Sequence, residues 1–346
     1  MDKEMTFAGK ADQDSRLRWM DMLRGLAISL VVVHHCVVYM YEKYPETFAF
    51  LKEVSELIAP IRMPVLFFLS GMLLAGSIDK GLGRYARGKL NNLIYPFVIW
   101  TLILYLLYQA REALLGLPSE IDLFSALVHD PWHHLWFLHY LAIYYAVGFF
   151  LFKSGLLVAA LFSVTLYLIG YAFDYGYFTA LFMFFMAGAF ANRTSDCPRW
   201  IAAHRIQLTW MGLGVIGLCL LAVALGLAPI AKHNLTYCII TAAAIPMMIN
   251  LAIHAQRWSV APSLAYLGRN SLVLYMVHVP VGIAFPLLLE RFAGFNPLYV
   301  FPLYLLMVFA ACLGVIWLRH RSRLVDLFFS AENLYPRRRT PVPRAV

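Results

Sequence analysis

Long apolar runs separated by short polar connections make up most of the 346-residue chain. A helix rises about 1.5 Å per residue and the hydrocarbon core of a bilayer is about 30 Å thick, so a spanning helix needs about 20 mostly apolar residues. We therefore expect an all-α polytopic membrane protein. The pattern predicts about ten transmembrane helices, over residues 26–41, 57–77, 93–109, 135–152, 155–173, 177–191, 207–230, 235–254, 271–289 and 298–318.

Lysine and arginine are unevenly distributed between alternate connections of this pattern. Of the 28 residues, 22 fall on the side that holds both ends of the chain and five fall on the other. Positive charge accumulates in the cytoplasmic connections of membrane proteins, so both termini are predicted to be cytoplasmic. We expect a cytoplasmic leader over 1–18, a transmembrane domain over 19–320 and a basic cytoplasmic tail over 321–346 that lies against anionic membrane lipids.

The composition excludes a water-soluble fold, because 62% of the residues are hydrophobic and only 14% are charged. Soluble domains have about 45–50% and 25%. The net charge of +9 follows from the predicted topology and needs no nucleic-acid partner. Four of the five cysteines lie inside apolar runs, and the histidines at 133, 134 and 139 match no standard zinc spacing. We therefore expect no bound metal.

Ionisable side chains inside spanning helices are costly, so each is a candidate for function. The first helix opens with Asp21 and Arg24 and carries His34 and His35 inside an apolar run. His35 lies about 16 Å along the axis from Arg24, and eleven residues is close to three turns, so the two share a face. A neutral imidazole near mid-bilayer could act as a general base on a hydroxyl. The alternative is a histidine that only hydrogen-bonds a neighbouring helix.

The second predicted helix and the connection after it carry further polar candidates. Arg62 lies within the helix, where it could bind a substrate or snorkel to the interface. Ser70 belongs to a Ser-Gly pair that could serve function or only permit close helix packing. The connection contains Arg84, Arg87 and Lys89. These basic residues either set the topology or clamp a phosphorylated ligand.

Four short segments, in order along the chain, resemble the motifs of the membrane-bound acyltransferase-3 family, bacterial proteins that move acetyl or other acyl groups onto glycans. The segments are Asp21, Arg24-Gly25 and His35; the Phe-Phe…Ser-Gly run at 67–71; Trp-Phe-Leu at 136–138; and Ser-Leu…Tyr-x-x-His at 271–278. Members often carry an Arg-x-x-Arg pair before a proline in the third helix. This chain has Lys89 and Asn92 before Pro96, a departure for which Arg84 or Arg87 could compensate.

The resemblance implies an acyl-CoA-dependent O-acyltransferase of the bacterial cytoplasmic (inner) membrane. Acetyl-CoA or succinyl-CoA would be the donor, and a hydroxyl of a cell-envelope glycan or a lipid-linked sugar the acceptor. His35 would be the general base, with Arg24 and Asp21 as its catalytic partners. The residues expected to bind donor or acceptor are Arg62, Ser70, Arg84, Arg87, Lys89, Trp136 and His278. Acetyl is the commonest donor of the family, and succinyl fits because Arg62 could pair with its free carboxylate.

Other interpretations of the same residues stay open. A covalent acyl-enzyme on Ser70 would need a base beside the hydroxyl. A transporter of a small organic acid or a lipid-linked sugar is the alternative function, because intramembrane histidine and arginine also serve proton and anion pathways. Trp136 also fits an interfacial aromatic belt without a role in binding. A separately encoded partner protein could complete the activity.

Overall fold

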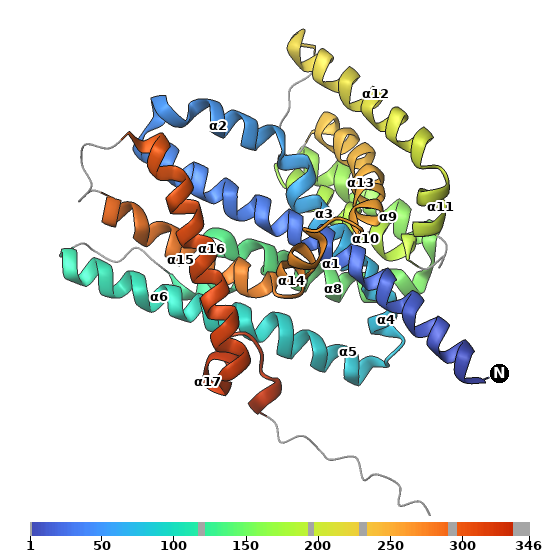
Figure 1. The fold of residues 1–346 in the computed structure, drawn as a ribbon, viewed down its shortest axis with the longest axis horizontal. Helices are drawn as coiled ribbons and strands as arrows, with labels where there is room; N and C mark the ends of the chain where they lie inside the picture. The colour runs from blue at the N-terminus through green and yellow to red at the C-terminus, as the bar shows by residue number, and fades with distance from the viewer. Residues whose placement is uncertain (1, 117–121, 193–196, 228–233, 290–295, 335–346) are drawn as a thin grey trace, which may run out of the picture.

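The computed structural model describes residues 2–116, 122–192, 197–227, 234–289 and 296–334. All regular structure in these ranges is helical, and the helices form one bundle (Figure 1). They are α1 (Asp2–Lys43), α2 (Pro45–Leu57), α3 (Ala59–Met72), α4 (Leu74–Ile78), α5 (Leu82–Lys89), α6 (Tyr95–Leu115), α7 (Leu123–Val128), α8 (Trp136–Ser154), α9 (Leu156–Ala172), α10 (Gly176–Ala191), α11 (Cys197–Ala203), α12 (Arg205–Ala224), α13 (Leu235–Ala255), α14 (Ala261–Arg269), α15 (Ser271–Leu289), α16 (Pro297–Arg321) and α17 (Arg323–Asp326).

Three short turns complete the described structure. A π-helical turn, η1 (Leu90–Ile94), joins α5 to α6. Two 3₁₀ turns are η2 (His133–Leu135), which leads into α8, and η4 (Glu332–Leu334), which follows α17. Single π-helical turns inside longer helices often mark functional sites.

Each apolar run that was expected to span the membrane overlaps a helix, although the run over 57–77 is divided between α3 and α4 and residues 228–230 of the run over 207–230 lie outside the described residues. Within the described residues, six helices are long and apolar enough to cross a bilayer, or seven if the bent pair α2 and α3, with an angle of 42° between them, counts as one span. Three shorter apolar helices, α9, α10 and α15, account for the remaining predicted segments. The chain is thus a helical, multi-pass membrane protein. The count of about ten spans and the cytoplasmic placement of both termini stay predictions.

Helix α1 is the central element of the bundle and packs against α2, α3, α13, α14, α15 and α16 (Figure 1). It runs without a break from Asp2 to Lys43, so the leader expected over 1–18 continues in the same helix as the first span. Helix α12, by contrast, lies at the edge of the bundle, and only 6% of its apolar 18-residue stretch is buried.

Pairs of glycines let helix backbones touch at two crossings. Where α1 crosses α14, a Cβ at Gly25 would lie 1.9 Å from the carbonyl oxygen of Leu264, and one at Gly268 would lie 1.8 Å from that of Asp21. Gly71 of α3 and Gly188 of α10 form the second crossing in the same way. Small residues are favoured between membrane helices because they permit such close approach. The Gly25 crossing fixes α1 against the segment that leads into α15.

Candidate active site

A cavity of about 340 Å³ opens beside His35, in the half of α1 away from the N-terminus. Its walls come from four helices: the middle of α1, the start of α3, the start of α8 and the start of α10. The lining residues are Val31, His34, His35, Ala59, Arg62, Met63, Trp136, Tyr140 and Tyr177. Three residues that the sequence singled out, His35, Arg62 and Trp136, are therefore brought together. We call this space the histidine cavity.

His278 of α15 contacts His35 directly. Its Nε2 lies 3.3 Å from Nδ1 of His35, and the ring centroids are 5.0 Å apart. Nδ1 of His278 lies 2.8 Å from the carbonyl oxygen of Leu274, to which it donates, so Nε2 of the neutral ring is an acceptor. Nδ1 of His35 therefore carries the proton, which it shares between His278 and the carbonyl oxygen of Val31 at 2.9 Å. This tautomer, assigned from the contacts, leaves the lone pair of His35 on Nε2.

His134 of η2 also packs against His278. Its ring centroid is 5.4 Å from that of His278, and its side chain is 2% exposed. The sequence pattern did not connect His134 with the two intramembrane histidines, because it lies before α8 in a stretch that reads as interfacial. Three imidazoles from three separate elements are thus in successive ring contact, with His278 touching both His35 and His134. Ring packing of this kind holds the orientation of His278 and, through it, of His35.

A second hydrogen-bonded group joins Arg62 to His34. Nη1 of Arg62 donates to Oγ of Ser55 at 2.8 Å, and the same Oγ lies 2.8 Å from Nδ1 of His34. Ser55, on α2, is buried, and no feature of the sequence pointed to it. It holds the guanidinium of Arg62 at the wall of the histidine cavity.

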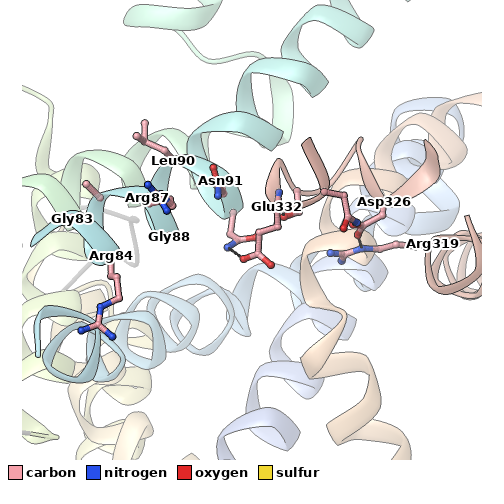
Figure 2. A pocket seen from close by; sticks show the side chains of 13 residues that line it. Gly83, Arg84, Arg87, Gly88, Leu90, Asn91, Arg319, Asp326 and Glu332 are labelled. Atoms are coloured by element: carbon pink, nitrogen blue, oxygen red, sulfur yellow. Dashed lines mark hydrogen bonds and ion pairs between the residues drawn. The ribbon is translucent and has the colours of Figure 1, made fainter. Parts of the chain in front are cut away.

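A larger basic cavity of about 1170 Å³ lies at the other end of the bundle, between α5, η1 and the segment after α16 (Figure 2). Arg84 and Arg87 of α5 line it, as predicted for a phosphate clamp. Arg319 lines it too, and its Nε donates to Oδ1 of Asp326 at 2.7 Å. Figure 2 shows Arg84 and the Arg319–Asp326 pair at opposite ends of this space. We call it the basic cavity.

Asn92, which stands where the family often has an arginine, lines the basic cavity without adding charge. Its Nδ2 donates to Oε1 of Glu332 at 2.8 Å, and its Oδ1 accepts from Oγ of Ser330 at 2.8 Å. The backbone N–H of Ala331 donates to the carbonyl oxygen of Asn91 at 3.1 Å. Asn92 therefore docks the segment after α17 onto η1, and this segment forms one wall of the basic cavity.

Lys89 and Ser70 line neither cavity. Nζ of Lys89 lies 3.3 Å from the ring centroid of Tyr145, a cation–π contact. The hydroxyl of Tyr145 donates to the carbonyl oxygen of Ser70 at 2.8 Å. Oγ of Ser70 donates to the carbonyl oxygen of Leu66 in its own helix at 2.7 Å, and Ser70 is about 12 Å further along α3 than Arg62. The structure thus separates Ser70 from His35.

Asp21 and Arg24 also lie apart from His35. Oδ1 of Asp21 is 3.8 Å from Nη1 of Arg24, and Oδ2 is 3.7 Å from Nη1 of Arg269. Both residues lie on the continuous helix α1, so Arg24 is about 16 Å from His35 along the helix axis. The carboxylate of Asp21 therefore joins α1 to the end of α14, beside the Gly25 crossing.

The helical bundle thus contains a cavity lined by His34 and His35 and a separate cavity lined by Arg84 and Arg87. The sequence profile described as "Acyltransferase domain" matches residues 17–318. The chain therefore belongs to the membrane-bound acyltransferase-3 family. This membership favours acyl transfer over the transporter alternative.

A curated relative supports this placement over a short stretch. The chain is 37% identical over 73 residues to the inner membrane protein YcfT of Escherichia coli (strain K12). The match covers 18% of this chain and about a fifth, 20%, of the relative. No solved structure matches the chain significantly.

Proposed function

We propose that the protein is an O-acyltransferase of the bacterial inner membrane that moves an acyl group from cytoplasmic acyl-CoA to a hydroxyl of a cell-envelope glycan or a lipid-linked sugar. The contact of 3.3 Å between His35 and His278, at the wall of a cavity, is the observation that carries the proposal. Acyl transfer needs a base that activates the nucleophile, and that base is commonly oriented by a third group. His35 would be the base for the acceptor hydroxyl, and His278 the group that orients it.

In the proposed reaction the acceptor hydroxyl lies in the histidine cavity and gives its proton to Nε2 of His35. The hydroxyl oxygen forms a bond to the thioester carbonyl carbon, and the bond from that carbon to sulfur breaks. The proton then passes from the imidazolium of His35 to the CoA thiolate. His278 accepts a hydrogen bond from Nδ1 of His35 throughout, which stabilises the positive charge that forms on the ring.

The basic cavity is suited to the phosphates of CoA. Arg84 and Arg87 provide guanidinium groups, which bind phosphate through charge-assisted and often bidentate hydrogen bonds. A volume of about 1170 Å³ is large for a single side-chain pocket and suits a nucleotide-sized ligand. In this arrangement the donor reaches the bundle from the end that was predicted to be cytoplasmic. Acetyl is the expected acyl group, with succinyl as the second.

Direct transfer is favoured over an acyl-enzyme on Ser70. The hydroxyl of Ser70 donates to Leu66 of its own helix, and no contact joins it to His35 among the described residues. A serine nucleophile needs its base within hydrogen-bond reach. Retention of acyl label on purified protein, measured without an acceptor, distinguishes the two routes.

Mass spectrometry of envelope glycans tests the proposed function. Cells that lack the gene are complemented with the parent, with His35→Ala or with His204→Ala. His204 is an exposed control histidine whose ring Nδ1 lies 2.9 Å from the carbonyl oxygen of Trp200. We expect one glycan to lose an acyl mass on deletion, and the parent and control to restore it while His35→Ala does not. Glycans that are identical in all strains would refute the proposal, and so would full restoration by a folded, membrane-inserted His35→Ala protein.

A further inference from the structure

Arg62 is a buried cation at the wall of the histidine cavity. The residue is 4% exposed, and its one hydrogen bond within the described residues goes to the neutral hydroxyl of Ser55. Arginine has five N–H donors, so four of them are left for other partners. No carboxylate of the described chain lies within 4.0 Å of this guanidinium as an ion-pair partner. A buried charge without a counter-ion is energetically costly. A protein retains such a charge at sites where a ligand supplies the opposite charge.

The surroundings of Arg62 hold one acidic group at longer range. Glu56 of α2, which is partly exposed, acts electrostatically on Arg62 and lines a neighbouring groove of about 590 Å³. Ala59 lines both this groove and the histidine cavity, so the two spaces adjoin. The lining of the histidine cavity itself contains no carboxylate. The ionisable side chains other than tyrosine that line the cavity are therefore Arg62, His34 and His35.

The other walls of the cavity suit a sugar ring. Trp136, Tyr140 and Tyr177 present aromatic surface from α8 and α10, and the Tyr177 ring stands 6.2 Å from that of Tyr237 in the neighbouring groove. A volume of about 340 Å³ is at the lower end of the range for ligand sites, which suits one sugar residue more than a chain. The hydroxyl to be acylated and a second substituent of the same ring would therefore fall at His35 and Arg62.

We propose that Arg62 binds a carboxylate of the substrate in the histidine cavity, beside the hydroxyl that His35 activates. The planar guanidinium matches a carboxylate in a bidentate pair, and the aromatic walls bind the ring that carries it. This inference rests on the proposed function, whose acceptor it narrows to an acidic glycan. The adjoining groove lies along the second half of α2 and gives a sugar access to Arg62, which favours a carboxylate on the acceptor sugar. The free end of a dicarboxylic acyl group is the other source of the same chemistry.

Binding to the purified full-length protein in lipid nanodiscs tests the inference without any turnover. The acceptor arm compares methyl β-D-glucuronide with methyl β-D-glucoside, which differ in charge at one carbon, and the donor arm compares succinyl-CoA with acetyl-CoA. Apparent dissociation constants come from the rise in unfolding temperature with ligand concentration. We expect the glucuronide to bind at least about tenfold more tightly than the glucoside, and Arg62→Gln to remove that difference.

Two further variants and one control variant keep the test decisive. Arg62→Lys retains the charge without the planar fork and should keep only part of the preference. Ser55→Ala, which leaves the arginine in place but removes its anchor, should weaken the preference and covers the case in which Arg62→Gln does not fold. Arg257→Gln removes one exposed positive charge elsewhere and should leave the preference unchanged.

The outcomes separate this inference from the proposed function. A preference for succinyl-CoA that depends on Arg62, with none between the sugars, would support the carboxylate site and assign it to the acyl group. Equal binding in both arms, or a preference that survives Arg62→Gln, would overturn it, even if the protein acylates a neutral glycan. An Arg62-dependent preference in a protein that acylates no glycan would instead overturn the proposed function alone.

Discussion

The substitution Gly25→Ala should disturb the active site from a distance, through the crossing of α1 with α14. The added Cβ would lie 1.9 Å from the carbonyl oxygen of Leu264, whereas real Cβ contacts essentially never fall under 3.0 Å. The two backbones must therefore separate by about 1.1 Å. The atoms that the Cβ would meet, in Leu264 and Gly268, all belong to the backbone, so side-chain rotation cannot relieve the clash. Overpacking of this kind costs about 1–3 kcal/mol of stability.

The same displacement reaches His278. Helix α14 ends at Arg269 and α15 begins at Ser271, so a shift of α14 is carried directly into α15. A movement of 1.1 Å away from α1 would open the 3.3 Å contact between His35 and His278 to more than 4 Å, beyond hydrogen-bond distance. A misplacement of about 1 Å can cost about 10²-fold in rate. We expect kcat for acyl transfer to fall about that far.

The measurement pairs unfolding temperature with acyl-transfer rate for the purified variants. Gly268→Ala places a Cβ at the same crossing from the α14 side, so it should lower the unfolding temperature and the acyl-transfer rate in the same way. Gly217→Ala is the matched control, because Gly217 lies on α12 and a Cβ there would meet nothing within 4 Å. Gly25→Ala protein that is as stable and as active as the control would refute the argument from backbone contact.

Further substitutions test the separate parts of the site. His278→Phe should lower kcat about 10- to 100-fold, because His35 loses its orienting acceptor, and should leave the KM for acyl-CoA unchanged; steady-state kinetics would contradict this by showing the reverse split. The double variant Arg84→Ala/Arg87→Ala should raise that KM at least about tenfold and weaken its dependence on salt, measured from 50 to 300 mM salt, because two phosphate-binding charges are lost. Asn92→Ala should expose the segment around Glu332 to limited proteolysis, whereas undiminished protection would show that the segment does not depend on this side chain.

The helices could be predicted from the sequence because their signal is local. Each apolar run of the right length forms a helix, whether or not it packs closely, as the edge helix α12 illustrates. Helix α2 and its bend into α3 were not predicted, since α2 carries Glu46, Lys52, Glu53 and Glu56 and was interpreted as part of a polar connection that ends where the apolar run over 57–77 begins. Chain length and hydropathy therefore indicate where helices form but do not indicate how adjacent helices are joined.

The site was predictable only in part, because its contacts join distant elements. Spacing along α1 identified His35, and polarity inside a span identified Arg62 and His278. His35 and Arg62 line the histidine cavity, and His278 contacts His35. Ser55 and His134 carry no such signal, since a serine in α2 and a histidine before α8 are ordinary at a membrane surface. Their places became clear only when the fold put them against Arg62 and His278.

The opening motif combines two tasks that its spacing alone did not separate. Shared helix face suggested that Arg24 assists His35, yet the ion pairs of Asp21 and the bare backbone of Gly25 both act at the crossing with α14. We interpret Asp21 and Gly25 as the part of the motif that fixes α1 against α14. His35, three turns later, is the proposed base that this crossing positions. On this interpretation Asp21→Asn should lower kcat with the same loss of stability as Gly25→Ala, whereas His35→Ala should lower kcat and leave the unfolding temperature nearly unchanged. Equal effects of both on chemistry alone would instead place Asp21 at the reacting groups.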